Sequence, residues 1–132
     1  MPIRRMDFNK IPFIGAFSFC TEKFVLIPDN VHLRPDNTSI LEAPIIRANV
    51  SKSPLLGILL AGNSRCILCS DLFRVETSTD LNSMGVEVNY LSGRFTALGN
   101  IVLSNDHGAV VSPELPSSTV KETVSYTHLR AH

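Results

Sequence analysis

The apolar residues of this chain fall into short runs rich in β-branched side chains, and polar turn residues separate the runs. The clearest example covers residues 98–112, where two apolar runs flank the sequence Asn-Asp-His-Gly at positions 105–108. Apolar runs on both sides of such a turn are a strong hairpin signal. We therefore expect strands over residues 98–104 and 109–112, joined by a tight turn.

The residues of this turn have the chemistry that a tight turn needs. Asn105 and Asp106 can accept hydrogen bonds from their own backbone, and Gly108 can take positive φ at no steric cost. We expect these three residues to specify the turn.

The same pattern occurs three times at a constant spacing of 42 residues. The earlier copies cover residues 14–28 and 56–70, and Asn63 is the equivalent of Asn105. The glycines at equivalent positions are Gly15, Gly57 and Gly99. Three copies in register indicate a repeat architecture. Because glycine within a strand usually marks a bulge or a close backbone approach, we expect strands to crowd near a common axis here, with a simple kink as an equal alternative.

Each hairpin is followed by a polar segment and, in the first two copies, by a further apolar run. The polar segments predict short helices. One is capped by Asp36, Asn37 or Thr38, one lies within residues 71–84 and ends at Gly85, and one begins at residues 113–116. The later apolar runs predict strands over residues 44–50 and 86–91. The result is an α/β repeat whose units must cover one another's apolar faces.

Composition excludes several classes of protein. The chain of 132 residues has zero net charge and only 18% charged residues, without the basic footprint of a free nucleic-acid binder. No apolar run is long enough to span a bilayer. The start of the chain lacks the apolar core of a secretory signal, and three cysteines, an odd number, suggest a reducing cytoplasmic setting.

Residues 124–132 share nothing with the repeat and correspond at every position to a translated sequencing-library adapter. We therefore expect the native sequence to end near Glu122 or Thr123 and exclude the tail from fold reasoning. This expectation also removes His128, Arg130 and His132 from the functional candidates.

The repeats resemble those of the translation initiation factor 6 family, its archaeal branch most closely. The matching segments are residues 7–25, 53–63 and, with the highest specificity, 96–115. The resemblance implies the pentein fold, an α/β propeller of five ββαβ units around a pseudo-fivefold axis. It places units at about residues 9–50, 51–92 and 93–123, the last one partial, so that the chain holds about three of the five.

The resemblance also implies a function without chemistry. The family binds the large ribosomal subunit, on a surface of ribosomal protein and rRNA, blocks premature joining of the small subunit and assists subunit biogenesis. Gly99 and Asn100 correspond to its ribosome-facing segment, whereas the alternative for Asn100 is a local turn bond. The resemblance implies a cytoplasmic monomer when full length, with no cofactor, metal, membrane or free nucleic acid.

Two departures from the family pattern matter. Cys66 stands where the family usually has Gly, at the position equivalent to Gly108, and would be strained if the turn needs positive φ. A ring cut open after three units also leaves unpaired edges and exposed apolar surface. We expect such a fragment to aggregate or to bind the subunit poorly.

Two other functions remain open from the sequence. One is a pentein enzyme that modifies guanidino groups, for which the candidates are Cys20, Cys66, Cys69, His32 and His107. Cys20 and Cys69 are expected to be small buried residues and His107 a solvated turn residue. The pair Cys66 and Cys69 lacks the second ligand pair of a structural zinc site, and residues three apart on a strand point to opposite faces. The other function is a repeat scaffold for a different protein partner.

Overall fold

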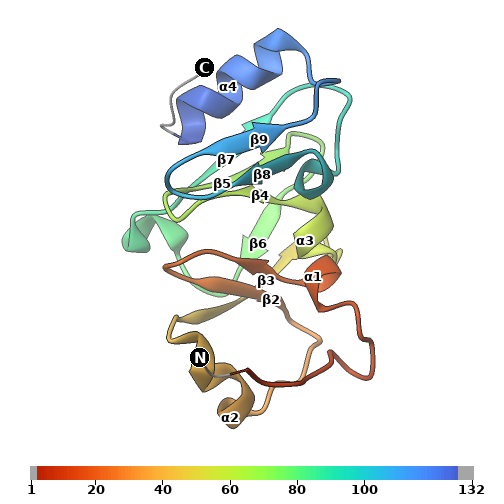
Figure 1. Ribbon diagram of the computed structural model, residues 1–132, viewed down its shortest axis with the longest axis vertical. Coiled ribbons are helices and arrows are strands. Elements are labelled where there is room, and N and C mark those ends of the chain that lie inside the picture. Colours follow the sequence, from red (N-terminus) through yellow and green to blue (C-terminus); the bar gives the residue numbers. More distant parts are fainter. Residues whose placement is uncertain (1–2, 128–132) are drawn as a thin grey trace.

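The computed structural model describes residues 3–127, which form three units stacked along the long axis of the molecule (Figure 1). Residues 1–2 and 128–132 lie outside the described residues, and with them His128, Arg130 and His132 of the expected tail.

The first unit is built on β1 (Phe19–Cys20), β2 (Val25–Pro28) and β3 (Ile45–Val50). β1 pairs antiparallel with β2, and β2 pairs in parallel with β3. The crossover between the parallel strands carries α2 (Pro35–Thr38) and the 3₁₀ turn η1 (Ser39–Leu41). The predicted third strand of the unit is therefore confirmed.

The second unit repeats this topology with β4 (Ala61–Gly62), β5 (Cys66–Ser70) and β7 (Glu87–Leu91). β4 is antiparallel to β5, and β5 is parallel to β7. An additional strand, β6 (Val75–Thr77), leaves this unit and pairs antiparallel with β3, which ties the second unit to the first sheet.

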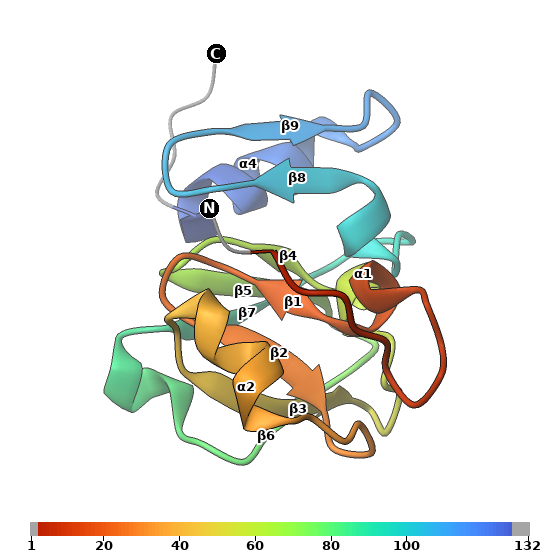
Figure 2. The ribbon, with the colours of Figure 1, turned by 60° about the horizontal axis from the view of Figure 1, so that its bottom comes forward.

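The third unit contains the antiparallel pair β8 (Val102–Ser104) and β9 (Ala109–Val111) and the helix α4 (Ser117–Thr127). Figure 2 shows this hairpin and α4 together at one end of the molecule, beyond the sheets of the other two units. α4 begins directly after Pro116, as the sequence predicts. It extends into the segment that was expected to be foreign, with Thr123 and Thr127 buried.

The glycine-containing segments are helical turns, so the prediction that each hairpin's first strand includes them is wrong. They form α1 (Ile14–Phe17), α3 (Leu56–Leu59) and the 3₁₀ turn η3 (Leu98–Asn100). The first strands begin only after these turns and are two or three residues long.

The residue before each helical turn explains this difference. Phe13, Leu55 and Ala97 have φ and ψ of −85° and 64°, −81° and 57°, and −90° and 68°, which are values of an inverse γ-turn. The amide of Ile14 bonds to the carbonyl of Pro12 at 3.0 Å, and the amide of Leu56 bonds to that of Pro54 at 2.8 Å. Each chain segment is thus bent sharply before it can extend into a strand.

The helical turns stack on one another, α1 on α3 and α3 on η3. A Cβ added at Gly57 would overlap the carbonyl oxygen of Gly15, and one added at Gly99 would overlap that of Gly57. The predicted close approach is confirmed at these two positions, between helical turns rather than strands. At Gly15, which starts the stack, an added Cβ would meet nothing within 4 Å.

The first unit is helical over residues 35–41 through α2 and η1, close to the predicted short helix, whereas the helix of the second unit is shorter than expected. Pro35 takes the first position of α2, and no side chain caps that helix, so Asp36, Asn37 and Thr38 are not its caps. In the second unit the helix is reduced to the 3₁₀ turn η2 (Leu81–Met84), capped by Asp80. Gly85 ends it in the left-handed region at φ 77°, as predicted.

Strand β5 separates two apolar cores. Cys69 and Ile67 face a core shared with the first unit, whereas Cys66 and Leu68 face a core shared with the third unit. A third cluster covers the outer face of β2, where Phe8 packs with Val25, Ile27 and Val31. The units therefore bury one another's faces, as the repeat pattern predicts.

Candidate functional site

The stacked units present two different rims, visible at opposite sides of Figure 1. One rim consists of the helical turns α1, α3 and η3 and carries the expected binding residues Gly99 and Asn100. The other consists of the hairpin turns around Thr21, Asn63 and Asn105.

The three hairpin turns share one hydrogen-bond arrangement. The Asn105 Oδ1 accepts bonds from the amides of His107 and Gly108 at 2.8 and 2.9 Å. The Asn63 Oδ1 accepts bonds from the amides of Arg65 and Cys66 at 3.0 and 3.2 Å. The Thr21 hydroxyl accepts bonds from the amides of Lys23 and Phe24 at 3.2 Å each. Asn63 and Asn105 thus make the bonds to their own turns that the sequence leads one to expect.

The predicted role of Gly108 is wrong. The described glycines with positive φ are Gly62, Gly85 and Gly93, and an added Cβ at Gly108 would meet nothing within 4 Å. The turn therefore does not need glycine there. For the same reason Cys66 at the equivalent position is not strained, and it lies buried at the start of β5.

Asp106 does not bond to its own turn but reaches across to the neighbouring unit. Its Oδ1 accepts a bond from the Ser64 amide at 2.8 Å, and its Oδ2 accepts one from the Ser64 hydroxyl at 2.6 Å. These bonds favour the ionised form and hold the pKa of Asp106 below its ordinary value, and the charges of Arg65 and Lys23 add to the effect. Asp106 thus links the second and third units by hydrogen bonds.

The sequence did not predict this link between units, nor a second hydrogen-bonded link beside it. The Ser104 hydroxyl donates a bond to the carbonyl oxygen of Gly62. Both contacts join residues 42 positions apart. The repeat spacing was the signal that could have found them, because equivalent positions of neighbouring units lie side by side.

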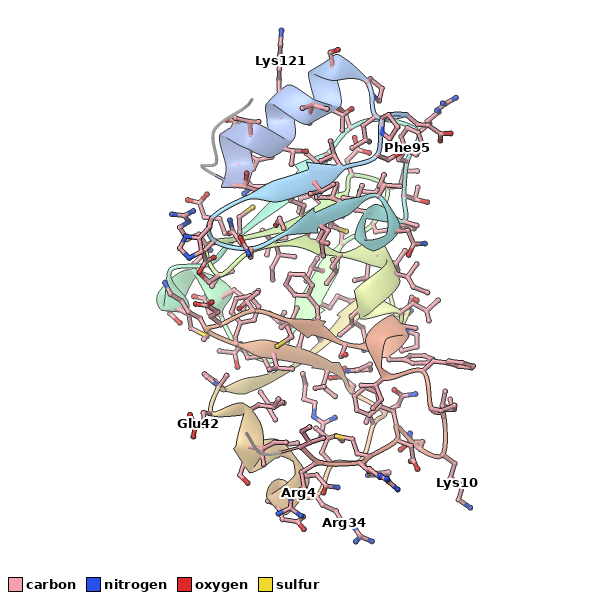
Figure 3. The ribbon with its side chains drawn as sticks, viewed as in Figure 1. Arg4, Lys10, Arg34, Glu42, Phe95 and Lys121 are labelled. Carbon is pink, nitrogen blue, oxygen red and sulfur yellow. The ribbon has the colours of Figure 1, made fainter. Side chains whose placement is uncertain are left out.

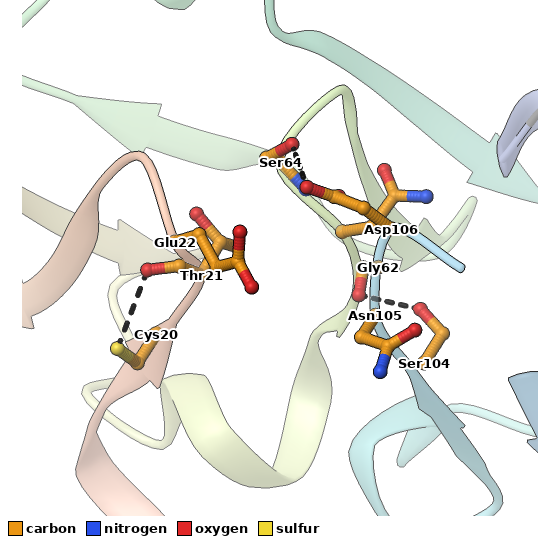
Figure 4. Close-up of a pocket in the computed structure, with 9 residues that line it drawn as sticks. Cys20, Thr21, Glu22, Gly62, Ser64, Ser104, Asn105 and Asp106 are labelled. Atoms are coloured by element: carbon orange, nitrogen blue, oxygen red, sulfur yellow. Dashed lines mark hydrogen bonds between the residues drawn. The ribbon is translucent and has the colours of Figure 1, made fainter. Parts of the chain in front are cut away.

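The hairpin turns enclose a hollow of about 270 Å³ (Figure 4). Its lining residues are Cys20, Thr21, Glu22, Gly62, Asn63, Ser64, Ser104, Asn105 and Asp106. The structure thus brings together Asn63, Asn105 and Asp106, whose acceptor oxygens are already engaged in the bonds above. Within residues 3–127, no group of three or more His, Cys, Asp or Glu side chains is placed to hold a metal ion.

The three thiols differ in exposure. Cys20 is exposed, so the prediction of a buried residue is wrong, whereas Cys69 is buried as predicted. Cys66 and Cys69 face different cores, which confirms that they point to opposite faces of the strand. Burial raises the pKa of all three thiols, that of Cys69 to about 11. A protonated thiol is a poor nucleophile, and no activated thiolate is present among them.

The two histidine candidates lie on the surface and belong to none of the apolar cores. His107 is exposed at the tip of the β8–β9 turn, as predicted, and His32 is exposed beside Asn9, whose Oδ1 accepts the His32 amide at 3.2 Å. Neither imidazole forms a hydrogen bond that would orient a catalytic base within the described chain. Among residues 3–127, no hydrogen bond pairs a candidate thiol with a candidate imidazole.

Asn100 lies at the exposed end of the stack of helical turns. Its backbone amide bonds to the carbonyl of Ala97 at 3.0 Å, while its side chain makes no hydrogen bond to residues 3–127. The alternative in which the side chain satisfies a local turn is therefore not seen in this part of the chain. Gly99, by contrast, packs against the Gly57 carbonyl and is partly covered.

Figure 3 shows Arg4, Lys10 and Arg34 at the end of the stack formed by the first unit, and Lys121 pointing outward from α4 at the other end. None of the helices described is both long enough and apolar enough to cross a membrane.

Comparison with known proteins gives a consistent result. The model of the eIF-6 family matches residues 3–127. Among curated proteins, translation initiation factor 6 of Pyrococcus furiosus is 32% identical over 130 residues, which cover 92% of this chain and 57% of the relative. Translation initiation factor 6 of Thermococcus kodakarensis is 33% identical over 86% of this chain and 53% of the relative. The protein of the same name from Methanothermobacter thermautotrophicus is 34% identical over 90% of this chain and 54% of the relative. The chain spans about half the length of the curated relatives it matches.

Proposed function

The chain belongs to the eIF-6 family, and from this premise we propose that it binds the large ribosomal subunit, blocks premature joining of the small subunit and assists subunit biogenesis. The proposed mechanism is steric occlusion by a rigid body, with Asn100 and Gly99 on the contact face. We propose further that the units are part of a five-unit pentein ring and that the full-length protein is a cytoplasmic monomer.

The observation that carries the proposal is the family match together with the exposed Asn100 amide at the end of the stack of helical turns. A side-chain amide without an internal partner can donate and accept bonds to a protein or RNA surface. Occlusion needs a rigid scaffold and a recognition face rather than a reactive group. The stacked turns supply the first, because neighbouring backbones touch without intervening side chains.

The proposal gives the chain no catalytic role. Its support is that burial raises the pKa values of the thiols and that, within the described residues, the exposed imidazoles form no hydrogen bond to a thiol. The zero net charge supports a specific subunit surface as partner rather than free nucleic acid.

Cosedimentation with purified large and small subunits of Pyrococcus furiosus tests the proposal, with the full-length factor of that organism in parallel. We expect the chain to pellet with the large subunit only, and more weakly than the full-length factor. Asn100→Ala should weaken pelleting about tenfold, the order of one or two lost hydrogen bonds to a charged or polar surface. Asn82→Ala, at another exposed asparagine, is the matched control.

Equal pelleting with both subunits would contradict the proposal, as would no pelleting at a hundredfold excess over the concentration that saturates the full-length factor. An Asn100→Ala variant that pellets like the parent chain would remove Asn100 from the contact face.

A further inference from the structure

Two tight turns hold a lysine in a backbone conformation that lysine rarely adopts. Residues 8–11 and 50–53 form two-residue hairpin turns, in which the outer residues exchange both backbone hydrogen bonds. The second central residue is Lys10 in the first turn and Lys52 in the other, at φ 70° and 69°, and the residue before each also has positive φ. These are the values of a type I′ turn, which favours glycine at this position. A lysine is strained there.

Each strained lysine is held by a carboxylate that bonds to its backbone amide. The Asp7 Oδ1 accepts a bond from the Lys10 amide at 2.8 Å, and the Glu76 Oε1 accepts one from the Lys52 amide at 3.0 Å. The two carboxylates are not equivalent in the repeat, since Asp7 precedes the first turn and Glu76 belongs to β6. Both lysines remain exposed. Strain that is supported twice by different means, at an exposed position, points to a function of the side chain.

The two lysines belong to a series of cations that recurs with the repeat, which we call the basic row. Its members Lys10, Lys52 and Arg94 are spaced by 42 residues and are all exposed. Each lies four residues before a helical turn, α1, α3 or η3. In the view shared by Figures 1 and 3, Lys10 projects on the side of α1, and Phe95 of the third unit lies on that side too. The Arg94 guanidinium lies over the Phe95 ring, 5.0 Å from its centre.

The basic row runs along the rim of helical turns that also carries Asn100. Because α1 packs on α3 and α3 on η3, the cations before these turns follow the direction in which the units stack. Further units at either end of the stack would lengthen this rim rather than cover it. A row of cations with a regular period matches a partner with regularly spaced anions. The phosphodiester backbone of an RNA strand has this property, whereas the carboxylates of a protein surface have no fixed period.

We propose that the basic row binds phosphate groups of one RNA strand of the large ribosomal subunit, beside the Asn100 contact. The inference rests on the proposed function and names the chemistry of the partner at that rim. Each ammonium or guanidinium group contacts phosphate oxygens and releases counterions from the RNA. Glycine would relieve the strain at residues 10 and 52 but would lack the charge, so stability is given up for binding there.

Cosedimentation with large subunits of Pyrococcus furiosus, at several KCl concentrations and constant Mg²⁺, tests the proposal. Lys10→Gln and Lys52→Gln should each weaken binding severalfold. Each should also lower the slope of log affinity against log salt by about one, the size expected for one lost phosphate contact. Lys52→Arg should bind like the parent chain. Lys121→Gln is the matched control, because Lys121 points outward from α4, and it should change neither quantity.

Stability measurements separate a lysine that binds from one that only supports the turn. Lys52→Gly should raise the urea midpoint of unfolding, because glycine adopts φ 69° without strain. The same variant should bind the subunit as weakly as Lys52→Gln. A purely structural role predicts no loss of binding in a stabilised variant. Glu76→Gln keeps an oxygen for the Lys52 amide and removes a negative charge beside the row, so it should strengthen binding.

The proposal is overturned if Lys10→Gln and Lys52→Gln keep the affinity and the salt slope of the parent chain, or if Lys52→Gly binds like the parent. A water-soluble carbodiimide joins amines to carboxylates but not to the phosphodiesters within a strand. A carbodiimide cross-link to a ribosomal protein that is lost in Lys52→Gln would therefore identify an acidic protein surface and overturn the RNA contact.

The outcome also distinguishes this inference from the proposed function. Failure of the parent chain to pellet with the large subunit contradicts the proposed function, and the inference with it. Normal pelleting of the parent chain together with unchanged lysine variants contradicts the inference alone.

Discussion

At the scale of single residues, Asp106 shows how an apparent turn residue acts between units. Its position in an Asn-Asp-x-Gly turn predicts local bonds, yet its carboxylate accepts both bonds from Ser64. Local sequence could not show this, because the partner lies one full repeat away. By contrast, Asn63 and Asn105 perform the local role that their sequence predicts.

The Asp106 contact gives a prediction for stability against pH. Its folded-state pKa is depressed, so the stabilisation is present above the ordinary value of 3.8 and is lost as the pH falls through the folded-state pKa. Asp106→Asn should lower the free energy of unfolding by about 1 kcal/mol at neutral pH, a size typical of a partly exposed charge-assisted bond.

Urea denaturation at several pH values measures this difference, with Asp71→Asn as the control at an exposed aspartate. The difference between Asp106→Asn and the parent chain should vanish in acid. A difference that stays constant down to the lowest pH would show that the carboxylate charge is not involved.

At the scale of elements, the sequence predicts the later strands of each unit well and the first strands poorly. β2, β5 and β9 and the third strands β3 and β7 are apolar runs with little competing signal. The segments around Gly15 and Gly57 are equally apolar, but a proline three residues before each glycine precedes an inverse γ-turn and a helical turn. Periodicity alone cannot separate a short apolar helix from a strand.

The face that carries Asn100 was therefore only partly predictable. The constant repeat spacing predicts that Asn100 belongs to the repeat. The position of Asn100 on a helical turn at the end of the stack depends on packing between units, which the sequence alone does not show. The same packing exposes the Asn100 side chain.

At the scale of the whole molecule, residues 124–127 take part in the fold whatever their origin. The carbonyl of Thr127 accepts bonds from the side chains of Asn63 and Arg65, at 3.3 and 3.4 Å. The adapter-like origin of residues 124–132 remains a prediction. Sequencing the source locus across codon 122 without adapter ligation measures it directly, and we expect the frame to continue through about two further units of this period. The same nine codons in independent genomic reads would refute the adapter origin.

The stack of glycine turns joins the three units and exposes Asn100. The free energies of unfolding of Gly57→Ala and Gly15→Ala, measured by urea denaturation at low protein concentration, test it most directly. Gly57→Ala should destabilise the protein by about 2 kcal/mol or more, because its Cβ overlaps the Gly15 carbonyl. Gly15→Ala should leave stability unchanged or raise it by up to about 1 kcal/mol, as alanine favours a helical turn. Equal effects at the two glycines would contradict the stacked-turn account.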